Sequence, residues 1–394
     1  MSEQRRRTLL KSFGTAATIG LSGLAGCAGQ SGDGSTETTA SAGTATDSTA
    51  TETDAETTVS SQTITDMAGR EVTVPATVER TIGLGSGALR MLTYLDAVDT
   101  VVGVETLETQ NEKRPYRPYV LANEELTDRT PIGSRKSPDT ERMLQQKPDV
   151  VFWAWAKQKK ADDLQSKLGV PVVVVNPGDL TPNLQGDVFE TLRTMGSVLG
   201  SDERAKEVVS YTKETVADLE SRTPSGDGPR SYIGYLGRGK HGLTYTQPLY
   251  PPFNLVGATN VVSGIAEDDL KKKKGAARTT IDPEQLIEWD PEYLFVDLGT
   301  ETYDALEDEE YQSITAIQNG DVYGVPPTRD YSINFGTVLA NGYYVGSVLF
   351  PEAYDDVDPT AKADAIYEQF VGAPIYDAVA EAYGGGFGKL DRFT

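Results

Sequence analysis

The chain has 394 residues, of which 59 are Asp or Glu and 36 are Lys or Arg, giving a net charge of −23 at pH 7. This balance excludes a generally cationic nucleic-acid binder, so no nucleic-acid partner is expected. A strongly acidic, solvated surface fits a protein from a salt-loving host, and the length is sufficient for two packed lobes.

Residues 1–27 have the features of an export signal that ends at a lipidated cysteine. A basic start, Arg5–Arg7, precedes an uncharged run of small and apolar residues, 13–26, which is too short to span a bilayer. The arginines resemble a twin-arginine signal, and the run LAGC, which ends at Cys27, resembles a bacterial-type lipobox. Cys27 is the only cysteine, so it has no partner for an internal disulfide. The resemblance implies lipid on Cys27; a plain secretory signal and the general export route are the alternatives.

Residues 28–62 are predicted to be a disordered linker. They are nearly all Ser, Thr, Ala, Gly, Asp and Glu, with no aromatic residue and no base. Such a segment cannot bury enough apolar surface to offset its loss of chain entropy on ordering. It would hold a folded body away from a membrane, and O-linked sugar on its Ser and Thr residues is an open question. No later stretch has the apolar length of a membrane helix.

Short apolar runs alternate with helical stretches through the remaining chain, which predicts an α/β fold. The runs are strand-length and rich in Val, Ile or aromatic residues. Nearly continuous apolar strands indicate sheets that are covered on both faces. The expected strands are 81–84, 100–104, 150–153, 171–175, 231–236 and 293–296.

An internal repeat indicates two lobes of like construction. Residues 139–152, DTERMLQQKPDVVF, align without a gap with residues 282–295, DPEQLIEWDPEYLF. Each copy predicts a helix with Asp at its N-cap and Glu in its first turn, a Pro that ends it, an acid and a buried strand. Unrelated α/β proteins also contain this pattern, so the repeat alone does not identify a family.

Residues 187–223, between the two copies, favour helix. Gly196 and Gly200 interrupt the helical pattern, and Ser201 can cap a second segment of about 33 Å at 1.5 Å per residue. We therefore predict an N-terminal lobe at 63–186, a long linking helix within 187–223 and a C-terminal lobe at 224–394. The cleft between the lobes would be the natural ligand site.

The body is similar to one family of substrate-binding proteins of ABC importers. The start of the body resembles the opening of the helix-linked group that carries iron–siderophore complexes, haem and cobalamin. It reads TDMAGREVTVP at 65–75, followed by VERTIGLG, a predicted helix and VVGV. The resemblance continues through TPIGSRKSPDTERMLQQKPDVVFWAW and GVPVVVV, covers 63–394 and points to archaeal, in particular haloarchaeal, members.

This resemblance implies a class III periplasmic-binding-protein-like fold and a role in solute capture. The partners would be an ABC permease and its ATPase, and the protein would be a monomer held by lipid on the extracellular face of the cell membrane. The expected ligand is an iron(III)–siderophore-like complex, with molybdate, tungstate or cobalamin as alternatives. Iron would be part of the transported ligand, and no cofactor is expected.

Two enzyme classes compete with this interpretation. A secreted hydrolase lacks support, because position 84 is Leu and the G-x-S-x-G elbow is absent. An exported dinucleotide-dependent oxidoreductase is the stronger alternative, since Gly83-x-Gly85-x-x-Ala88 follows a strand and Glu105 lies about 20 residues on. The short glycine motif is weak, however, and the binding-protein family has the same strand–loop–helix. We therefore expect no enzyme activity.

The first candidates for ligand contact follow strands of the first lobe. Ser86 and Gly87 stand at a predicted helix N-terminus, where free N–H groups favour an anion, or form only a capping turn. Trp153 and Trp155 offer flat stacking surfaces, although at least one is expected in the core. Arg135, just before the repeat, is either a ligand contact or plain surface charge.

A denser cluster lies in the second lobe, where a Gly-rich loop follows a strand. Arg fits carboxylate or phosphate bidentately, and Tyr can donate a hydrogen bond or ligate a metal. Whether the single histidine ligates iron or is a surface imidazole stays open, so no metal site is assigned. The candidates are Tyr235, Arg238, Lys240, His241 and Tyr245 in this loop, and Arg329 and Tyr331 in a later one.

The resemblance also implies a docking surface. In this family one glutamate on the outer surface of each lobe contacts arginines of the permease. Glu141 and Glu284 match that pattern and occupy equivalent places in the repeat. The alternative is that both are first-turn glutamates favoured by the helix dipole, worth about 0.3–1 kcal/mol each.

Overall fold

The computed structural model describes residues 60–109, 117–181, 185–237, 241–265, 278–299 and 302–390. All of them belong to one unit, Thr57–Thr394. The predicted export signal, Cys27 and nearly all of the predicted linker lie outside the described residues, as do Arg238 and Lys240. Within the described ranges, no helix combines the length and the apolar character that a membrane crossing requires.

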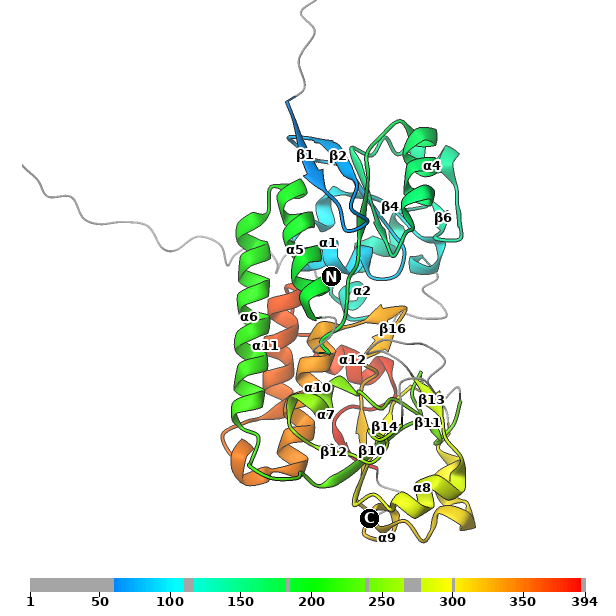
Figure 1. Ribbon diagram of the computed structural model, residues 1–394, viewed down its shortest axis with the longest axis vertical. Helices are drawn as coiled ribbons and strands as arrows, with labels where there is room; N and C mark the ends of the chain where they lie inside the picture. The colour runs from blue at the N-terminus through cyan, green and yellow to red at the C-terminus, as the bar shows by residue number, and fades with distance from the viewer. Residues whose placement is uncertain are drawn as a thin grey trace, which may run out of the picture. The chain divides into compact units, whose positions relative to one another are not determined.

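The first lobe is built on a five-stranded parallel sheet with the order β5-β4-β3-β8-β9 (Figure 1). The apolar runs predicted at 81–84 and 150–153 form its two central strands. Its strands are β3 (Thr81–Leu84), β4 (Val101–Val104), β5 (Thr130–Pro131), β8 (Val150–Ala154) and β9 (Val172–Val175). Two hairpins complete the lobe, β1 (Ser61–Thr65) with β2 (Glu71–Pro75) and β6 (Gly133–Ser134) with β7 (Ser137–Pro138). Its helices are α1 (Ala88–Tyr94), α2 (Pro118–Ala122), α3 (Thr140–Gln145) and α4 (Gln158–Leu168).

The second lobe has a sheet with the order β12-β10-β14-β15-β18, parallel except for the edge strand β18. Its strands are β10 (Arg230–Gly234), β12 (Thr259–Asn260), β14 (Tyr293–Asp297), β15 (Val322–Val325) and β18 (Gly388–Lys389). Two short pairs lie apart from it, β11 (Tyr245–Thr246) with β13 (Thr279–Thr280) and β16 (Arg329–Asp330) with β17 (Ser332–Ile333). The helices are α7 (Pro251–Leu255), α8 (Pro283–Trp289), α9 (Thr315–Gln318), α10 (Phe335–Leu349), α11 (Pro359–Val371) and α12 (Tyr376–Ala382).

Four strands have the same order in both sheets, β4-β3-β8-β9 in one and β12-β10-β14-β15 in the other. The strands that end the two repeat copies, β8 and β14, occupy equivalent positions beside the central strands β3 and β10. The sequence repeat therefore belongs to a repeat of the whole lobe. The predicted two-lobe α/β fold is confirmed.

The acid after the repeat proline has a structural task. The Asp149 carboxylate accepts hydrogen bonds from the backbone N–H groups of Glu79 at 2.9 Å and Arg80 at 2.8 Å. In the other lobe the Glu292 carboxylate accepts one from the N–H of Arg230 at 2.9 Å. Each acid thus fixes the start of the central strand against its neighbour, which explains why both copies keep an acid there.

Two helices connect the lobes, α5 (Gln185–Leu199) and α6 (Asp202–Ser221). The expected interruption at Gly196 is wrong, because α5 continues through it. A Cβ at this position would lie 2.7 Å from the Cβ of Ala205, so glycine permits the close packing of α5 on α6. Gly200, with φ +70°, follows α5 in the left-handed conformation, as expected beyond a helix end. Ser201 is the N-cap residue of α6, without a side-chain cap bond.

One apolar core extends through both lobes. The Tyr94 ring, from α1, lies 4.9 Å from the Phe370 ring of α11 and 6.0 Å from the Phe335 ring of α10. Arg204 of α6 donates hydrogen bonds to the carbonyls of Tyr94, at 3.0 Å, and Gln369. These contacts between lobes oppose a wide rotation of one lobe against the other.

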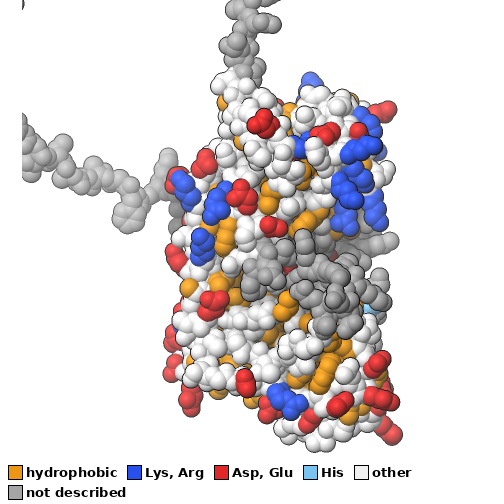
Figure 2. Space-filling model, viewed as in Figure 1, with side chains coloured by type: hydrophobic (Ala, Val, Ile, Leu, Met, Phe, Trp, Pro, Cys, Tyr) orange, Lys and Arg blue, Asp and Glu red, His pale blue; other side chains and the backbone are white. Residues whose placement is uncertain are grey.

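Charged side chains are unevenly spread over the face shown in Figure 2. Lys and Arg gather over the part that α4 and β6 occupy in Figure 1, and Asp and Glu gather near α8 and α9. On that face, the region of α4 and β6 is therefore the more basic one and the region of α8 and α9 the more acidic one.

Candidate ligand-binding site

The carboxyl ends of the parallel strands bring the candidate residues together. Ligands of open α/β sheets bind beyond these ends. The Tyr331 hydroxyl, from the second lobe, donates a hydrogen bond of 2.6 Å to Glu105, which follows β4. A guanidinium nitrogen of Arg329, which begins β16, lies 3.8 Å from the carboxylate of Asp179, beyond β9. The strand ends of the two lobes therefore face one another.

Glu105 links the two sides of this cleft. Its carboxylate is buried and accepts hydrogen bonds from the backbone N–H groups of Gly85, at 3.0 Å, and Arg135, besides the Tyr331 hydroxyl. Burial raises the pKa of this carboxyl, and the hydrogen bonds act in the opposite direction. Because these donors occupy both oxygens, the ribose-binding role that the dinucleotide motif suggested for Glu105 has no support.

Ser86 and Gly87 lie between β3 and α1, where the lobes approach each other. Ser86 is buried, and its Oγ accepts a hydrogen bond of 3.1 Å from Arg135. A Cβ on Gly87, whose φ is +104°, would lie 2.9 Å from the Pro177 ring and 3.3 Å from Ser332 Oγ. The glycine therefore allows a close approach of chain segments at this point.

The structure separates the two tryptophans. Trp153 is 6% exposed and packs in an apolar cluster on one face of the first sheet. Trp155 is 45% exposed and has a left-handed backbone with φ 62°; its indole N–H donates to the Ser86 carbonyl at 3.1 Å. Only Trp155 presents a ring to solvent, at the end of β8.

Three aromatic residues of this region share an uncommon backbone conformation. Trp155, Tyr235 and Tyr331 have φ values of 62°, 57° and 62°. Bulky residues rarely adopt a positive φ, and the associated strain is concentrated at functional sites. All three follow β8, β10 or β16 directly, so the strain coincides with the ends of strands and with the turn between β16 and β17.

The remaining second-lobe candidates differ in exposure. Tyr235 is buried, with its ring 5.1 Å from that of Tyr303, and burial raises the pKa of its hydroxyl. His241 is exposed, and its ring lies 4.5 Å from that of Tyr245 in β11. The Arg135 guanidinium lies 5.7 Å from the Tyr331 ring centre. Among the described residues, no group of three or more His, Cys, Asp and Glu side chains is placed to hold a metal ion.

Sequence reasoning missed Arg278. Its Nε and one Nη are buried without a hydrogen-bond partner among the described residues. The pKa of Arg329 is lowered to about 10, mainly by burial and next by the positive charge of Arg278. The negative charge of Asp179 acts in the opposite direction. The positive charge of Arg90 also lowers the pKa of Arg329. Arg90 is buried, and its Nε donates a hydrogen bond of 2.9 Å to Asn334. Unpaired buried cations are costly, and a bound anion would offset that cost.

The repeat contains a signal for Arg278. Extending its gap-free alignment by four residues toward the N-terminus pairs Arg135 with Arg278. Arg135 contacts Ser86 in the loop after β3. An Nη of Arg278 lies close to Gly237 in the loop after β10, 3.6 Å from the position that a Cβ would have there. The two lobes thus each direct one arginine to the loop that follows the central strand.

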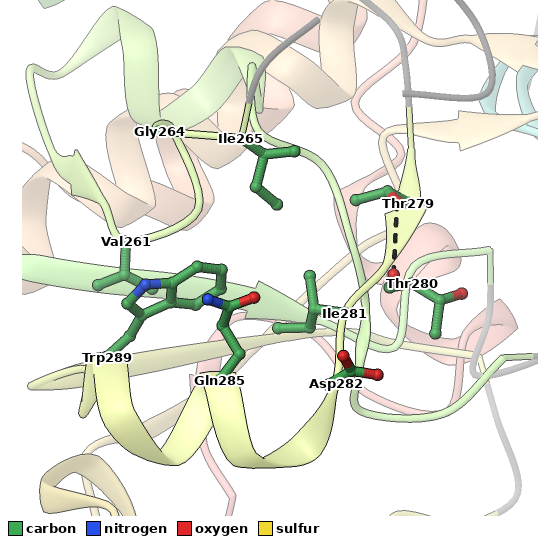
Figure 3. A pocket seen from close by; sticks show the side chains of 9 residues that line it. All are labelled: Val261, Gly264, Ile265, Thr279, Thr280, Ile281, Asp282, Gln285 and Trp289. Carbon is green, nitrogen blue, oxygen red and sulfur yellow. Dashed lines mark hydrogen bonds between the residues drawn. The ribbon is translucent and has the colours of Figure 1, made fainter. Parts of the chain in front are cut away.

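A separate cavity of about 590 Å³ lies between α8 and β13 (Figure 3). Trp289 and Gln285 project into it from α8, opposite Ile265 and Ile281. None of the predicted site residues lines it. The lining consists of Val261, Gly264, Ile265, Thr279, Thr280, Ile281, Asp282, Gln285 and Trp289.

Comparison with known proteins decides the family. The family described as periplasmic binding protein matches residues 82–328. The chain belongs to this family. Its relatives include the molybdate-binding protein MolA of Haemophilus influenzae, 23% identical over 76% of this chain and 88% of the relative. Another is the Fe(3+)-citrate-binding protein YfmC of Bacillus subtilis, 23% identical over 64% of this chain and 75% of the relative.

Solved structures agree on the fold. MolA with bound molybdate superposes with a TM-score of 0.62 at 20% identity, covering 79% of this chain and 98% of that one. A periplasmic solute-binding protein of Veillonella parvula superposes with a TM-score of 0.65 at 16% identity, covering 82% of this chain and 97% of that chain. The family match and the curated relatives, rather than these superpositions, show a solute-binding protein and not an enzyme, and they confirm the predicted role in an ABC importer.

The glutamates suggested for docking occupy like positions in this periplasmic binding protein. Glu141 lies in the first turn of α3 and Glu284 in the first turn of α8, and both are exposed. Asp139 caps α3 by accepting a hydrogen bond of 3.1 Å from the N–H of Arg142, whereas the Asp282 side chain makes no such cap bond. Both glutamates are exposed on equivalent helices, so both are available to a partner.

Proposed function

We propose that this periplasmic binding protein captures an anionic iron(III)–siderophore-like complex and delivers it to an ABC permease and its ATPase. The observation that carries the proposal is the half-buried guanidinium of Arg278 beside Arg329, because its Nε and one Nη are buried without a hydrogen-bond partner among the described residues. A planar guanidinium binds carboxylate or catecholate-type oxygens in a fixed geometry, so two of them favour an oxygen-rich anion. The names of two relatives, for molybdate and Fe(3+)-citrate, agree with an anionic ligand.

The aromatic residues favour a ligand larger than a bare oxyanion. The exposed Trp155 ring offers a stacking surface that molybdate or tungstate would not use. Cobalamin is also disfavoured, because it would depend more on the tryptophans and Trp153 is buried. We propose Arg135, Arg278 and Arg329 as the anion contacts. The rest of the proposed ligand set is Ser86, Gly87, Trp155, Tyr235, Arg238, Lys240, His241, Tyr245 and Tyr331.

Replacing Arg278 by Met tests the ligand class. A charge-assisted hydrogen bond is worth about 1.5–3 kcal/mol, so affinity for ferric citrate or a ferric catecholate should fall roughly 10- to 150-fold. Without ligand, melting should stay unchanged or rise, because Met removes an unpaired buried cation. Titration calorimetry with ferric citrate, a ferric catecholate, molybdate and cyanocobalamin measures this. Arg193→Met, at an exposed site on α5, is the control. Tight cyanocobalamin binding that is independent of Arg278 would contradict the proposal.

We also propose the chain's location and organisation. It is a monomeric lipoprotein of archaeal, haloarchaeal type, exported by the twin-arginine route and held on the extracellular face of the cell membrane. The linker 28–62 separates the anchor from lobes 63–186 and 224–394, which the region 187–223 joins. The acidic composition and the run LAGC at Cys27 support this.

Changing Cys27 to Ser should move the protein from the membrane fraction to the medium, because lipid attachment requires the sulfur. Immunoblots of separated membrane and medium fractions measure the distribution. Arg5→Lys with Arg6→Lys should leave precursor inside the cell if export depends on the arginine pair. A Ser variant that stays with the membrane would refute the lipid anchor.

A further inference from the structure

The two lobes carry different charge at equivalent positions. Residues 139–168 begin with the first repeat copy, and residues 282–311 begin with the second. The first segment has six Lys and Arg residues and five acids, whereas the second has twelve acids and no base. Because the lobes share their strand order, each segment runs from the helix before β8 or β14 into the connection that follows that strand.

The exposed lysines at the start of α4 and along it form what we name the α4 patch: Lys157, Lys159, Lys160 and Lys167. None of the four makes an ion pair with another described residue, although the protein is acidic overall. The surface over α4 is rich in Lys and Arg in Figure 2. Helix α4 packs beside α3, which carries Glu141, so the patch adjoins a suggested docking residue.

In the second lobe the connection that corresponds to α4, between β14 and β15, contains two short 3-10 helices, η5 (Asp304–Glu307) and η6 (Glu309–Tyr311), followed by α9. Glu307, Asp308, Glu309 and Glu310 are exposed there. A partner that contacts both lobes at equivalent places therefore meets lysines on one side and carboxylates on the other.

We propose that the α4 patch docks on an acidic region of the permease, so that the lobes contact unlike halves of their partner. This rests on the proposed function. A permease of two identical halves presents the same residues to both lobes by two-fold symmetry, and one charge cannot complement both. A permease of two different subunits removes that conflict. A uniformly anionic lipid surface fits less well, because it would attract one lobe and repel the other.

Charge reversal on α4 tests this. Lys159→Glu with Lys160→Glu should slow association with the permease complex in neutral-lipid nanodiscs roughly tenfold at low salt, and the difference should shrink as salt rises. Lys206→Glu with Lys213→Glu, at two exposed sites of α6, changes the net charge by the same amount; this matched control should associate like the unaltered protein. Glu309→Lys with Glu310→Lys should also slow association. Stopped-flow mixing of labelled protein measures the rates.

The outcomes separate the two proposals. If the unaltered protein loaded with ferric citrate does not associate at all, delivery to the permease fails, and this inference fails with it. If the unaltered protein associates and the α4 variant associates at the same rate or faster, only this inference fails. Faster association of the variant would indicate that both halves of the permease are basic. Binding to anionic vesicles without permease that is lost in the α4 variant would assign the patch to lipid and also overturn the proposal.

Discussion

Replacing both Glu141 and Glu284 by Ala is expected to abolish ligand-stimulated ATP hydrolysis by the reconstituted transporter. Both side chains are exposed on equivalent helices, α3 and α8, and neither forms an ion pair with a described residue. Each is free to contact a permease arginine, and a charge-assisted contact at each lobe would hold the protein in register. ATPase assays in proteoliposomes, with and without ferric citrate, measure the effect.

The same double variant should bind ferric citrate normally and melt almost unchanged. Loss of two favourable helix-dipole interactions costs only about 0.3–1 kcal/mol each. Glu288→Ala, on α8 and also exposed, is the control and should keep stimulation. Full stimulation by the double variant would reduce both glutamates to helix-terminal residues.

The fold was predictable because its signals are local. Apolar runs such as 150–153 and 293–296 are strand-length and buried on both faces, so periodicity alone places them. The repeat then indicates two lobes, since helix cap, proline and strand recur at one spacing. Gly196 was misjudged because sequence shows its helix-weakening tendency and not its contact with Ala205, nine positions away on another helix.

The site was predictable only in part, because its geometry depends on tertiary contacts. Strand ends can be located, so the sequence places Ser86, Trp155 and Tyr331 near them, and their contact with a ligand stays a prediction. Which tryptophan is buried depends on the side of β8 that it faces and on the positive φ of Trp155. Arg278 stands before a two-residue strand that carries no strong pattern, and only the extended repeat relates it to Arg135.

Arg117→Leu is expected to destabilise the first lobe severely at neutral pH. Arg117 and Glu108 are both buried and form an ion pair, and the Tyr119 hydroxyl lies 3.0 Å from the carboxylate as a second donor. Removing one partner of a buried pair leaves the other charge uncompensated, which costs about 3–5 kcal/mol. Arg142→Leu is the control, since its pair with Asp139 is half-exposed and contributes about 0–1 kcal/mol.

The loss should depend on pH in a defined direction. Burial raises the pKa of Glu108, while Arg117 and Tyr119 oppose that rise. Without Arg117 the pKa in the folded state rises further, so the native variant binds a proton that the unfolded chain releases. Stability is then retained below the ordinary carboxyl pKa of about 4.3 and lost as pH rises through the folded-state value.

Denaturant unfolding at pH 5 and pH 7.5 measures this. The variant should lose clearly more stability at pH 7.5 than at pH 5, relative to the unaltered protein at each pH. Glu108→Leu added to Arg117→Leu should restore much of the loss at pH 7.5, because no buried charge remains. Equal losses at both pH values, together with no recovery in the double variant, would show that Arg117 acts through packing rather than through its charge.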